Sequence, residues 1–426
     1  MKSKILALLF PLFALSQGYT SYFTGSATDR VVATDFGVCL MGGATEHDNA
    51  MRWLLQKANG GDVVVLRSSG SNGYNDYLYT QLGVTVNSVE TLVITSVAGA
   101  TNPYVLNKVA KAEMIWFAGG DQWDYISYFK NNALEDLINQ HINTKHAPIG
   151  GTSAGMAILG GKYFSAQNGS VTSAEALANP YNSLVTLGND DFLQVPYLDN
   201  VITDTHYDNP DRRGRQAVFL ARFKNDLSIN VNGIACNEYV AVCIDNMGKA
   251  RVFGDYPNYQ EFAYFIQGNC TNSTNVNTCQ LNTPLTWNFP QGALKVYKVP
   301  GTMTGINYFN LDNWQNAIGS GGSFENWSIN SGVLVANPGA APDCTLTTNE
   351  FEENGIQILP NPFTDSFTVN GIESGILNIY DSQGRVVLAT HFSNTSNINT
   401  TALSKGLYSI KIESQGKMTL RKALKR

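Results

Sequence analysis

Hydrophobic runs alternate with amphipathic stretches through the first half of the chain. Residues 36–41, 62–66, 92–95 and 112–117 are apolar runs that predict buried strands, whereas residues 46–57 and 133–141 space their apolar positions for helices. Strands that are apolar on both faces and separated by helices are typical of a parallel sheet covered on both sides. The pattern predicts a doubly wound α/β domain, in which ligands bind outside the carboxyl ends of the strands.

The pattern changes toward the C-terminus. Residues 234–245 and 250–253 still predict adjoining strands that finish the sheet, but the segment after residue 300 is rich in Gly, Asn and Ser. Short alternating strands then return and predict a small β-sandwich. We therefore expect an α/β domain at 17–300, a linker or small β appendage at 301–354, and a C-terminal sandwich at 355–426.

The first residues predict export. Residues 1–16 carry two lysines, a short apolar run and small residues spaced for cleavage, which indicates a secretory signal peptide. The six cysteines of an exported chain can pair, so Cys270 with Cys279 is one candidate disulfide and Cys236 with Cys243 a second. Cys39 lies in an apolar strand pattern and is expected to be a buried thiol.

Charge excludes one class of function. The formal net charge is −6 and no run of lysines and arginines occurs, so nothing in the sequence indicates nucleic-acid binding.

A candidate nucleophile lies at a glycine-framed corner between a strand and a helix. Gly151-Thr-Ser-Ala-Gly155 has the small residues that a sharp strand-to-helix turn needs, and it places the Ser153 hydroxyl at the sheet edge. The N–H of Ala154 would then meet the oxyanion formed when Ser153 attacks a carbonyl. The alternative is an ordinary glycine-rich turn with a solvated serine.

A second glycine turn follows the strand at 112–117. An amide of Gly119 or Gly120 could complete the oxyanion hole with Ala154, and Asp121 and Gln122 could bind polar groups of the substrate. Asp121 could equally cap the following helix.

His206 is the candidate base. It follows the apolar run 197–202 and lies among acids and arginines, where an imidazole could take the Ser153 proton and return it to the leaving amine. The alternative is a structural histidine. Chemistry of this kind uses no metal and no organic cofactor, so we expect none.

These motifs resemble a family of serine peptidases that includes cyanophycinase and aspartyl dipeptidase (peptidase E). The resemblance lies in Phe117-Ala-Gly-Gly-Asp-Gln122, Gly150-Gly-Thr-Ser-Ala-Gly155 and Asp204-Thr-His206 with Arg213-Gly-Arg215, in the family's order. It covers about residues 30 to 300. It implies a flavodoxin-like, class I glutamine-amidotransferase-like fold, with Ser153 as nucleophile and His206 as base.

The resemblance also implies a triad glutamate between the serine and the histidine. Glu175 is the only glutamate in that interval, so it is the expected acid, and Asp204 is the alternative. Glu175 could instead be a solvated helical residue.

The expected substrate is a peptide rich in aspartate. Arg213 and Arg215 follow the base closely, and with Asp204 they could border its binding site, because a guanidinium matches a carboxylate. The two arginines could equally belong to a solvated helix start paired with nearby acids. The resemblance implies hydrolysis of an aspartyl or β-aspartyl bond, as in cyanophycin, a polyaspartate that carries arginines on its side chains. A homodimer is left open.

The C-terminal segment resembles the sorting domain of type IX secretion cargo. It has the Pro-Asn-Pro opening at 360–362, a Gly-Leu-Tyr strand at 406–408 and basic final residues. The resemblance implies recognition by the type IX machinery and a location at the cell surface or in the medium. The rival function is a non-catalytic surface binding protein on the same scaffold, which would not require a nucleophile with a base.

Overall fold

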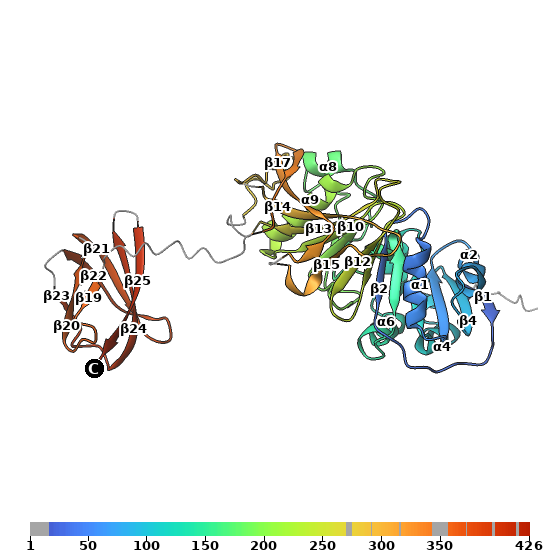
Figure 1. Cartoon of the computed structure of the whole chain (residues 1–426), viewed down its shortest axis with the longest axis horizontal. Helices are drawn as coiled ribbons and strands as arrows, with labels where there is room; N and C mark the ends of the chain where they lie inside the picture. The colour runs from blue at the N-terminus through green and yellow to red at the C-terminus, as the bar shows by residue number, and fades with distance from the viewer. Residues whose placement is uncertain are drawn as a thin grey trace, which may run out of the picture. The chain divides into compact units, whose positions relative to one another are not determined.

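The computed structural model describes residues 17–269, 275–290, 292–314, 317–342, 357–371, 373–393, 397–414 and 417–426. The predicted signal peptide at 1–16 lies outside these residues. The chain divides into two compact units, residues 1–344 and 345–426, which are called here the first and second unit. Figure 1 shows helices and strands intermixed in the first unit and strands alone in the second.

A ten-stranded sheet forms the centre of the first unit. Its strand order is β1-β4-β3-β5-β6-β2-β11-β12-β15-β16, and the five strands from β4 to β2 run parallel. These parallel strands are β4 (Ser88–Ile94), β3 (Asp62–Arg67), β5 (Met114–Phe117), β6 (Ile149–Thr152) and β2 (Val38–Met41). Apolar runs predicted β2, β3, β4 and β5, and burial on both faces explains why these runs are continuous. The glycine-framed corner at Ser153 predicted β6.

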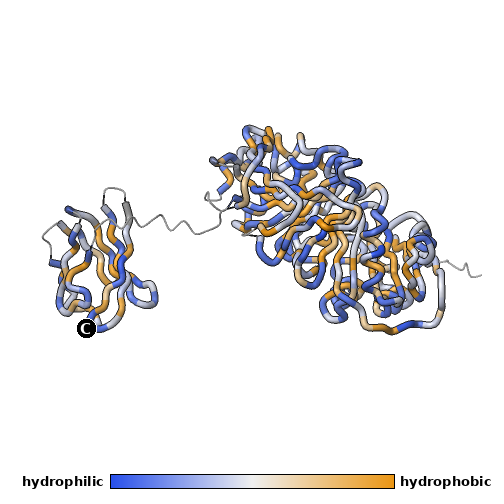
Figure 2. The backbone as a smooth tube through the Cα atoms, in the orientation of Figure 1, coloured by the Kyte–Doolittle hydropathy of each residue, from blue (hydrophilic) through white to orange (hydrophobic). Residues whose placement is uncertain are grey.

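Helices cover both faces of this sheet. On one face, α4 (Pro103–Lys111), α5 (Gln122–Phe129) and α6 (Ala133–Asn143) pack against alternate strand residues such as Leu66 and Phe117. On the other face, α1 (Asp48–Lys57) packs against their neighbours Val65 and Trp116. Figure 2 shows hydrophobic and hydrophilic stretches alternating along the backbone of the first unit. The doubly wound, flavodoxin-like arrangement is confirmed.

An eight-stranded sheet lies in the same unit. Its order is β18-β17-β14-β13-β10-β9-β7-β8. The helix α9 (Arg213–Leu227) packs on one face of it through Val218, Phe219 and neighbouring residues. The other face shares a hydrophobic core with the ten-stranded sheet. This core includes Phe265 and Val299 of the eight-stranded sheet and Val242 of the ten-stranded sheet. The two sheets are therefore packed into one body.

The segment 234–245 differs from the prediction of one strand. It forms two, β10 (Asn232–Cys236) in the eight-stranded sheet and β11 (Ala241–Ile244) in the ten-stranded sheet. The chain passes from one sheet to the other through residues 237–240. The polar pair Asn237-Glu238 interrupts the apolar run at this point.

Residues 301–338 extend the two sheets rather than forming a linker. The strands β15 (Tyr308–Asn310) and β16 (Gly319–Ser320) join the ten-stranded sheet, and β17 (Ser323–Asn330) and β18 (Val333–Pro338) join the eight-stranded sheet. Trp327 is fully buried in the core beneath α9. This segment belongs to the first unit.

The remaining elements of the first unit complete the two sheets and their connections. They are β1 (Tyr19–Gly25), α2 (Gly73–Asp76), η1 (Tyr77–Gln81), α3 (Val97–Ala100), α7 (Ala154–Ala157), β7 (Lys162–Phe164), α8 (Ser173–Ala178), β8 (Leu187–Asn189), β9 (Val201–Asp204), β12 (Lys249–Phe253), β13 (Phe262–Gly268), β14 (Leu294–Pro300) and η2 (Leu311–Asn313). None of the helices in the described residues is both long enough and apolar enough to span a membrane.

The second unit is the expected β-sandwich. One sheet has the order β19-β20-β23 and the other β22-β21-β24-β25. Their bounds are β19 (Gln357–Leu359), β20 (Ser366–Asn370), β21 (Ser374–Tyr380), β22 (Val386–Ser393), β23 (Asn397–Asn399), β24 (Gly406–Ser414) and β25 (Lys417–Lys425). Phe363, Phe367 and Ile410 lie in the core between the sheets.

Candidate active site

Ser153 lies at the corner between β6 and α7. Its backbone has φ 52° and ψ −118°, a conformation that costs a non-glycine residue on the order of 1–3 kcal/mol. The surrounding structure holds this geometry, because the Ser153 N–H donates to the Met41 carbonyl at 3.0 Å. The Ser153 side chain is partly exposed at the carboxyl end of β6. A strained serine at this place is what a nucleophile elbow requires.

The glycines that frame Ser153 are needed for close packing. A Cβ on Gly151 would lie 2.5 Å from the backbone of Gly155, and a Cβ on Gly155 would lie 2.4 Å from the Phe117 carbonyl oxygen. The helix α7 can therefore start directly against β5. The small residues that suggested the turn in the sequence have this steric cause.

His206 reaches Ser153 from the other sheet. It follows β9, and its Nε2 lies 2.8 Å from Ser153 Oγ. Its N–H donates to the Gly42 carbonyl at 2.8 Å, and its φ is 46°. Gly43 leaves room for the ring, because a Cβ there would lie 2.4 Å from Nε2. The loop after β2 therefore holds the imidazole against the serine.

Glu238 lies on the opposite side of the imidazole. Its Oε1 is 2.6 Å from His206 Nδ1, and the His206 bond is the main cause that lowers the pKa of this carboxyl. Glu238 lies in the connection between β10 and β11, so two sheets meet at this contact. The prediction missed Glu238 because it looked for the acid between Ser153 and His206, and it read residues 234–245 as one strand. The polar interruption Asn237-Glu238 was the signal that could have located it.

Glu175 does not contact His206. It lies in the first turn of α8, where its carboxylate accepts from the backbone N–H of Thr172 at 2.9 Å and from the Thr172 hydroxyl at 2.8 Å. Thr172 in turn accepts from the Glu175 N–H, which completes a capping box. The carboxylate that bonds to His206 is therefore Glu238, and not the expected Glu175. Glu175 stabilises a helix terminus at the surface.

Asp204 and Arg215 form a buried ion pair. Nε of Arg215 donates to Asp204 Oδ2 at 2.9 Å, a second bond joins Nη2 to Oδ1, and both side chains are about 4% exposed. The remaining donor of Arg215, Nη1, bonds to Ser170 Oγ and Val171 O. These bonds occupy both side chains, and the Asp204 carboxylate bonds to Arg215 rather than to His206.

Arg213 is also occupied, but at the surface. Its Nε and Nη2 bond to the carboxylate of Asp211, and this bond is the main cause that raises the pKa of Arg213. The expected carboxylate clamp of Arg213 and Arg215 is therefore not formed. At the start of α9, the guanidinium of Arg215 is buried and that of Arg213 is exposed.

The glycine turn after β5 borders the serine, as its place at a strand end predicted. A Cβ on Gly119 would lie 3.5 Å from Ser153 Cβ. Gly120 has φ 153°, which a side chain rarely allows. Ala154 is the first residue of α7, so its N–H has no intrahelical acceptor. Gly120 and Ala154 thus lie in the two turns that flank Ser153.

The polar residues after this turn have structural partners. Asp121 is the N-cap of α5 and accepts from the Trp123 N–H at 2.9 Å. Gln122 donates through Nε2 to the Phe164 carbonyl at 3.3 Å. Asp121 remains exposed, whereas Gln122 is half-buried.

A cavity of about 610 Å³ opens beside the loops that hold the triad. Thr45 and Tyr239 line it; Thr45 follows Gly43 by two residues and Tyr239 follows Glu238 directly. Four carboxylates also line it, those of Glu46, Asp48, Asp255 and Glu261. Arg52 is paired with Asp48, so the cavity has a net negative charge. Burial is the main cause that raises the pKa of Glu261.

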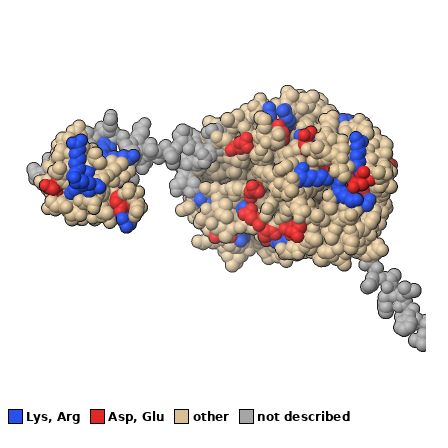
Figure 3. Space-filling view, turned by 90° about the horizontal axis from the view of Figure 1, so that it is seen from below, with Lys and Arg blue, Asp and Glu red and all other residues tan. Residues whose placement is uncertain are grey.

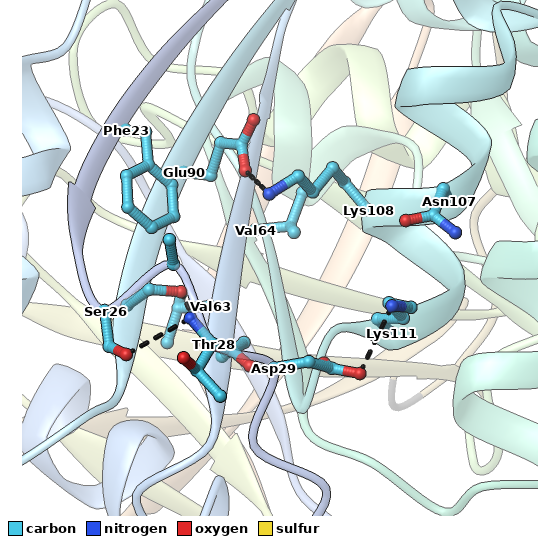
Figure 4. Close-up of a pocket in the computed structure, with 13 residues that line it drawn as sticks. Phe23, Ser26, Thr28, Asp29, Val63, Val64, Glu90, Asn107, Lys108 and Lys111 are labelled. Carbon is cyan, nitrogen blue, oxygen red and sulfur yellow. Dashed lines mark hydrogen bonds and ion pairs between the residues drawn. The ribbon is translucent and has the colours of Figure 1, made fainter.

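A smaller cavity of about 80 Å³ lies at the other end of the ten-stranded sheet, between β1, β3, β4 and α4. Figure 4 shows its charged residues pointing toward one another, Lys108 to Glu90 and Lys111 to Asp29. Because these charged groups pair with each other across the cavity, we interpret them as a structural network and not as a binding site.

The charges on one face of the molecule are mixed. Figure 3 shows Lys and Arg side chains of the first unit in small separate groups, with Asp and Glu side chains among them. In the described part of the chain, no three His, Cys, Asp or Glu side chains are grouped to hold a metal ion.

The described cysteines are free thiols, which corrects the predicted pairing of Cys236 with Cys243. Cys243 lies opposite Cys39 on β2, with the two Sγ atoms 3.8 Å apart, while Cys236 Sγ faces the Leu40 carbonyl. Cys39 is buried, as predicted. Cys279 is also a buried thiol, and its predicted partner Cys270 lies outside the described residues.

Comparison with known proteins identifies relatives for each unit. Residues 67–249 match the model of peptidase family S51, and residues 357–426 match that of the secretion system C-terminal sorting domain. The chain is 26% identical over 149 residues to the cyanophycinase of Geminocystis herdmanii, covering 34% of this chain and 49% of that protein. It is 25% identical over 228 residues to the cyanophycinase of Synechococcus elongatus, covering 51% of this chain and 65% of that protein.

Two solved structures are also similar. A peptidase from an acI-B1 Actinobacterium aligns with a TM-score of 0.39 and 15% identity, covering 54% of this chain and 94% of the other. A putative peptidase E from Listeria monocytogenes aligns with a TM-score of 0.32 and 16% identity, covering 50% of this chain and 95% of the other. The chain thus spans between about half and two thirds of the length of the cyanophycinases it matches.

The match to the sorting domain supports secretion or a location at the cell surface. Over residues 67–249, the first unit of the chain is similar to peptidase family S51.

Proposed function

We propose that the first unit is a serine peptidase in which Ser153 is the nucleophile, His206 the base and Glu238 the acid. The observation that carries this proposal is the continuous chain of bonds from Ser153 Oγ to His206 Nε2 at 2.8 Å and from Nδ1 to Glu238 at 2.6 Å. A nucleophile bonded to a base, which an acid orients in turn, is the arrangement that activates a hydroxyl. The strained backbone of Ser153 supports the same role.

In the proposed reaction, Ser153 Oγ attacks the carbonyl carbon of the peptide bond while His206 Nε2 takes its proton. Glu238 keeps the imidazole in the tautomer that has a proton on Nδ1. The N–H groups of Gly120 and Ala154 stabilise the oxyanion. His206 then gives its proton to the leaving amine, and water hydrolyses the acyl-enzyme by the same path.

A fluorophosphonate probe tests the nucleophile directly. Wild-type protein should be labelled at Ser153, and Ser153→Ala should not. Ser127→Ala is the control, because Ser127 is a half-buried serine on α5 that only bonds to the Asp124 carbonyl. If Ser153→Ala were labelled as fast as wild type, or wild type not at all, the serine mechanism would fail and the rival binding function would be favoured.

The acidic cavity supports a substrate with cationic side chains. With Arg213 and Arg215 both occupied, no described arginine pair forms the expected clamp for aspartate. The carboxylates of Asp255 and Glu261 could instead attract a guanidinium or ammonium group beside the scissile bond. Cyanophycin carries such arginines on its aspartate backbone, and the cyanophycinase relatives support it as the substrate to test first.

Peptide pairs that differ in one charge test this substrate class. We expect hydrolysis of cyanophycin, and a KM that is lower for an arginine peptide than for the same peptide with citrulline. Glu261→Gln should reduce that preference. Equal KM values for the two peptides would exclude the cavity as the site of a cationic side chain and leave the serine mechanism intact.

A further inference from the structure

We propose that Asn209 is a positioning residue that orients the carboxylate of Glu238 toward His206. This inference rests on the proposed serine mechanism. Glu238 Oε1 bonds to His206 Nδ1 at 2.6 Å, and its other oxygen, Oε2, accepts from Asn209 Nδ2 at 3.3 Å. Each carboxylate oxygen therefore has one donor, and the two donors come from the same loop.

The carboxylate needs such a second donor. The Glu238 side chain is about 20% exposed, so without Asn209 its outer oxygen would face water. The last torsion of a glutamate side chain has a broad energy minimum, and one bond to an imidazole leaves the carboxylate free to turn. A second bond to the amide fixes the plane of the carboxylate and hence the direction in which it holds the ring.

The loop that carries Asn209 is itself tied to both triad partners. The Asn209 N–H donates to the His206 carbonyl at 3.2 Å, and the neighbouring Asp208 accepts from the Glu238 N–H at 3.0 Å. The Arg212 N–H closes the loop on the Tyr207 carbonyl at 3.0 Å. Asn209 thus lies at a defined place between base and acid, although its side chain is exposed.

The amide also shares the negative charge of Glu238 with the imidazole. His206, Asn209 and Arg212 all lower the pKa of this carboxyl, and Asp208 is the nearby acid that faces its backbone. Without the Asn209 amide, the Glu238 carboxylate has no side-chain donor other than His206 among the described residues and therefore favours the protonated imidazole more strongly. The pH below which the serine ceases to be activated should then rise.

The rate of fluorophosphonate labelling measures this effect without a known substrate. In that reaction Ser153 Oγ forms a bond to phosphorus, fluoride leaves, and the serine proton passes to His206 Nε2. The labelling rate of the full chain is followed from pH 5 to pH 9. Its plateau reports the alignment of the triad, and its acid midpoint reports protonation of the base.

We expect Asn209→Ala to lower the plateau rate about tenfold, well below the loss for removing a triad member. Its acid midpoint should move to higher pH, and that of Asn209→Asp should move further, because a second carboxylate favours the imidazolium. Asn225→Ala is the matched control. Asn225 makes the same kind of bond, from its amide to Asp226 at 3.1 Å, at the exposed end of α9.

Loss of folding and loss of the positioning role of Asn209 give different experimental results. Thermal unfolding shows whether each variant is folded, and Asn209→Ser, which keeps a short donor, should retain a rate between those of wild type and Asn209→Ala. If Asn209→Ala kept the wild-type plateau and midpoint, or lost rate with an unchanged midpoint, the positioning role would be overturned. Labelling of Ser153→Ala would instead overturn the serine mechanism, so the two failures are distinguishable.

Discussion

His206 Nδ1 and Glu238 Oε1 are 2.6 Å apart. The two residues follow neighbouring strands of the eight-stranded sheet, and a loop of the ten-stranded sheet bonds to the backbone beside both. His206 follows β9 and Glu238 follows β10, and these strands run parallel. The loop after β2 then accepts the N–H of His206 at Gly42 and that of Tyr239 at Gly43. The contact exists because two sheets are packed against each other at this point.

Glu238→Gln should lower the rate of hydrolysis by on the order of 10³ to 10⁴, because an amide no longer selects the imidazole tautomer that accepts the serine proton. Glu175→Gln is the control and should keep nearly full activity, since Glu175 only closes the capping box of α8. Initial rates of both purified variants decide the matter. A large loss in Glu175→Gln with a small one in Glu238→Gln would reverse the assignment.

Gly43→Ala should abolish most activity without unfolding the protein. A Cβ at this position would lie 2.4 Å from His206 Nε2, so the ring would have to leave Ser153. Gly83→Ala is the control for backbone strain. Gly83 also has a positive φ, 68°, but a Cβ added there would have nothing within 4 Å. We expect at least a hundredfold loss of labelling rate for Gly43→Ala, by analogy with misplaced catalytic groups. Equal rates in the two variants would contradict the steric argument.

Arg215→Met should lower the free energy of unfolding by about 3–5 kcal/mol, because it leaves the Asp204 carboxylate buried without its partner. Arg213→Met removes a guanidinium two residues earlier, from an exposed pair with Asp211, and should cost no more than about 1 kcal/mol. Urea unfolding of both variants gives the comparison. The carboxylate-clamp hypothesis would return if Arg213→Met were stable yet raised KM for aspartyl substrates alone.

His141 should make the stability of the first unit depend on pH. Burial lowers the pKa of His141 to about 4, and its Nε2 lies 3.0 Å from the Pro148 carbonyl. The unfolded chain binds a proton near pH 6.5 but the folded chain does not, so stability falls as the pH drops from 6.5 to 4 and changes no further below. The loss from this group is on the order of 3 kcal/mol.

His141→Gln tests that prediction, because glutamine keeps a donor for Pro148 but does not titrate. The difference in unfolding free energy between pH 7 and pH 4.5 should be smaller in the variant than in wild type. The same difference in both proteins would show that other groups cause the pH dependence.

Local sequence determined much of this protein. Continuous apolar runs predicted β2 to β5, because strands covered on both faces must be apolar on both. The turn at Ser153 was visible because only glycine fits at Gly151 and Gly155. The C-terminal sandwich followed from alternating strands with Asn, Gly and Ser turns. In each case, the physical constraint acts between residues that are close along the chain.

Only the tertiary structure decided which carboxylate meets His206. Glu175 and Asp204 were nearer in sequence, but a capping box holds the first and buried Arg215 holds the second. Glu238 reaches the imidazole because β10 runs beside β9 and the chain then crosses to the other sheet. The pairing of strands that are distant in sequence is set by the packing of the whole core, which no local pattern records.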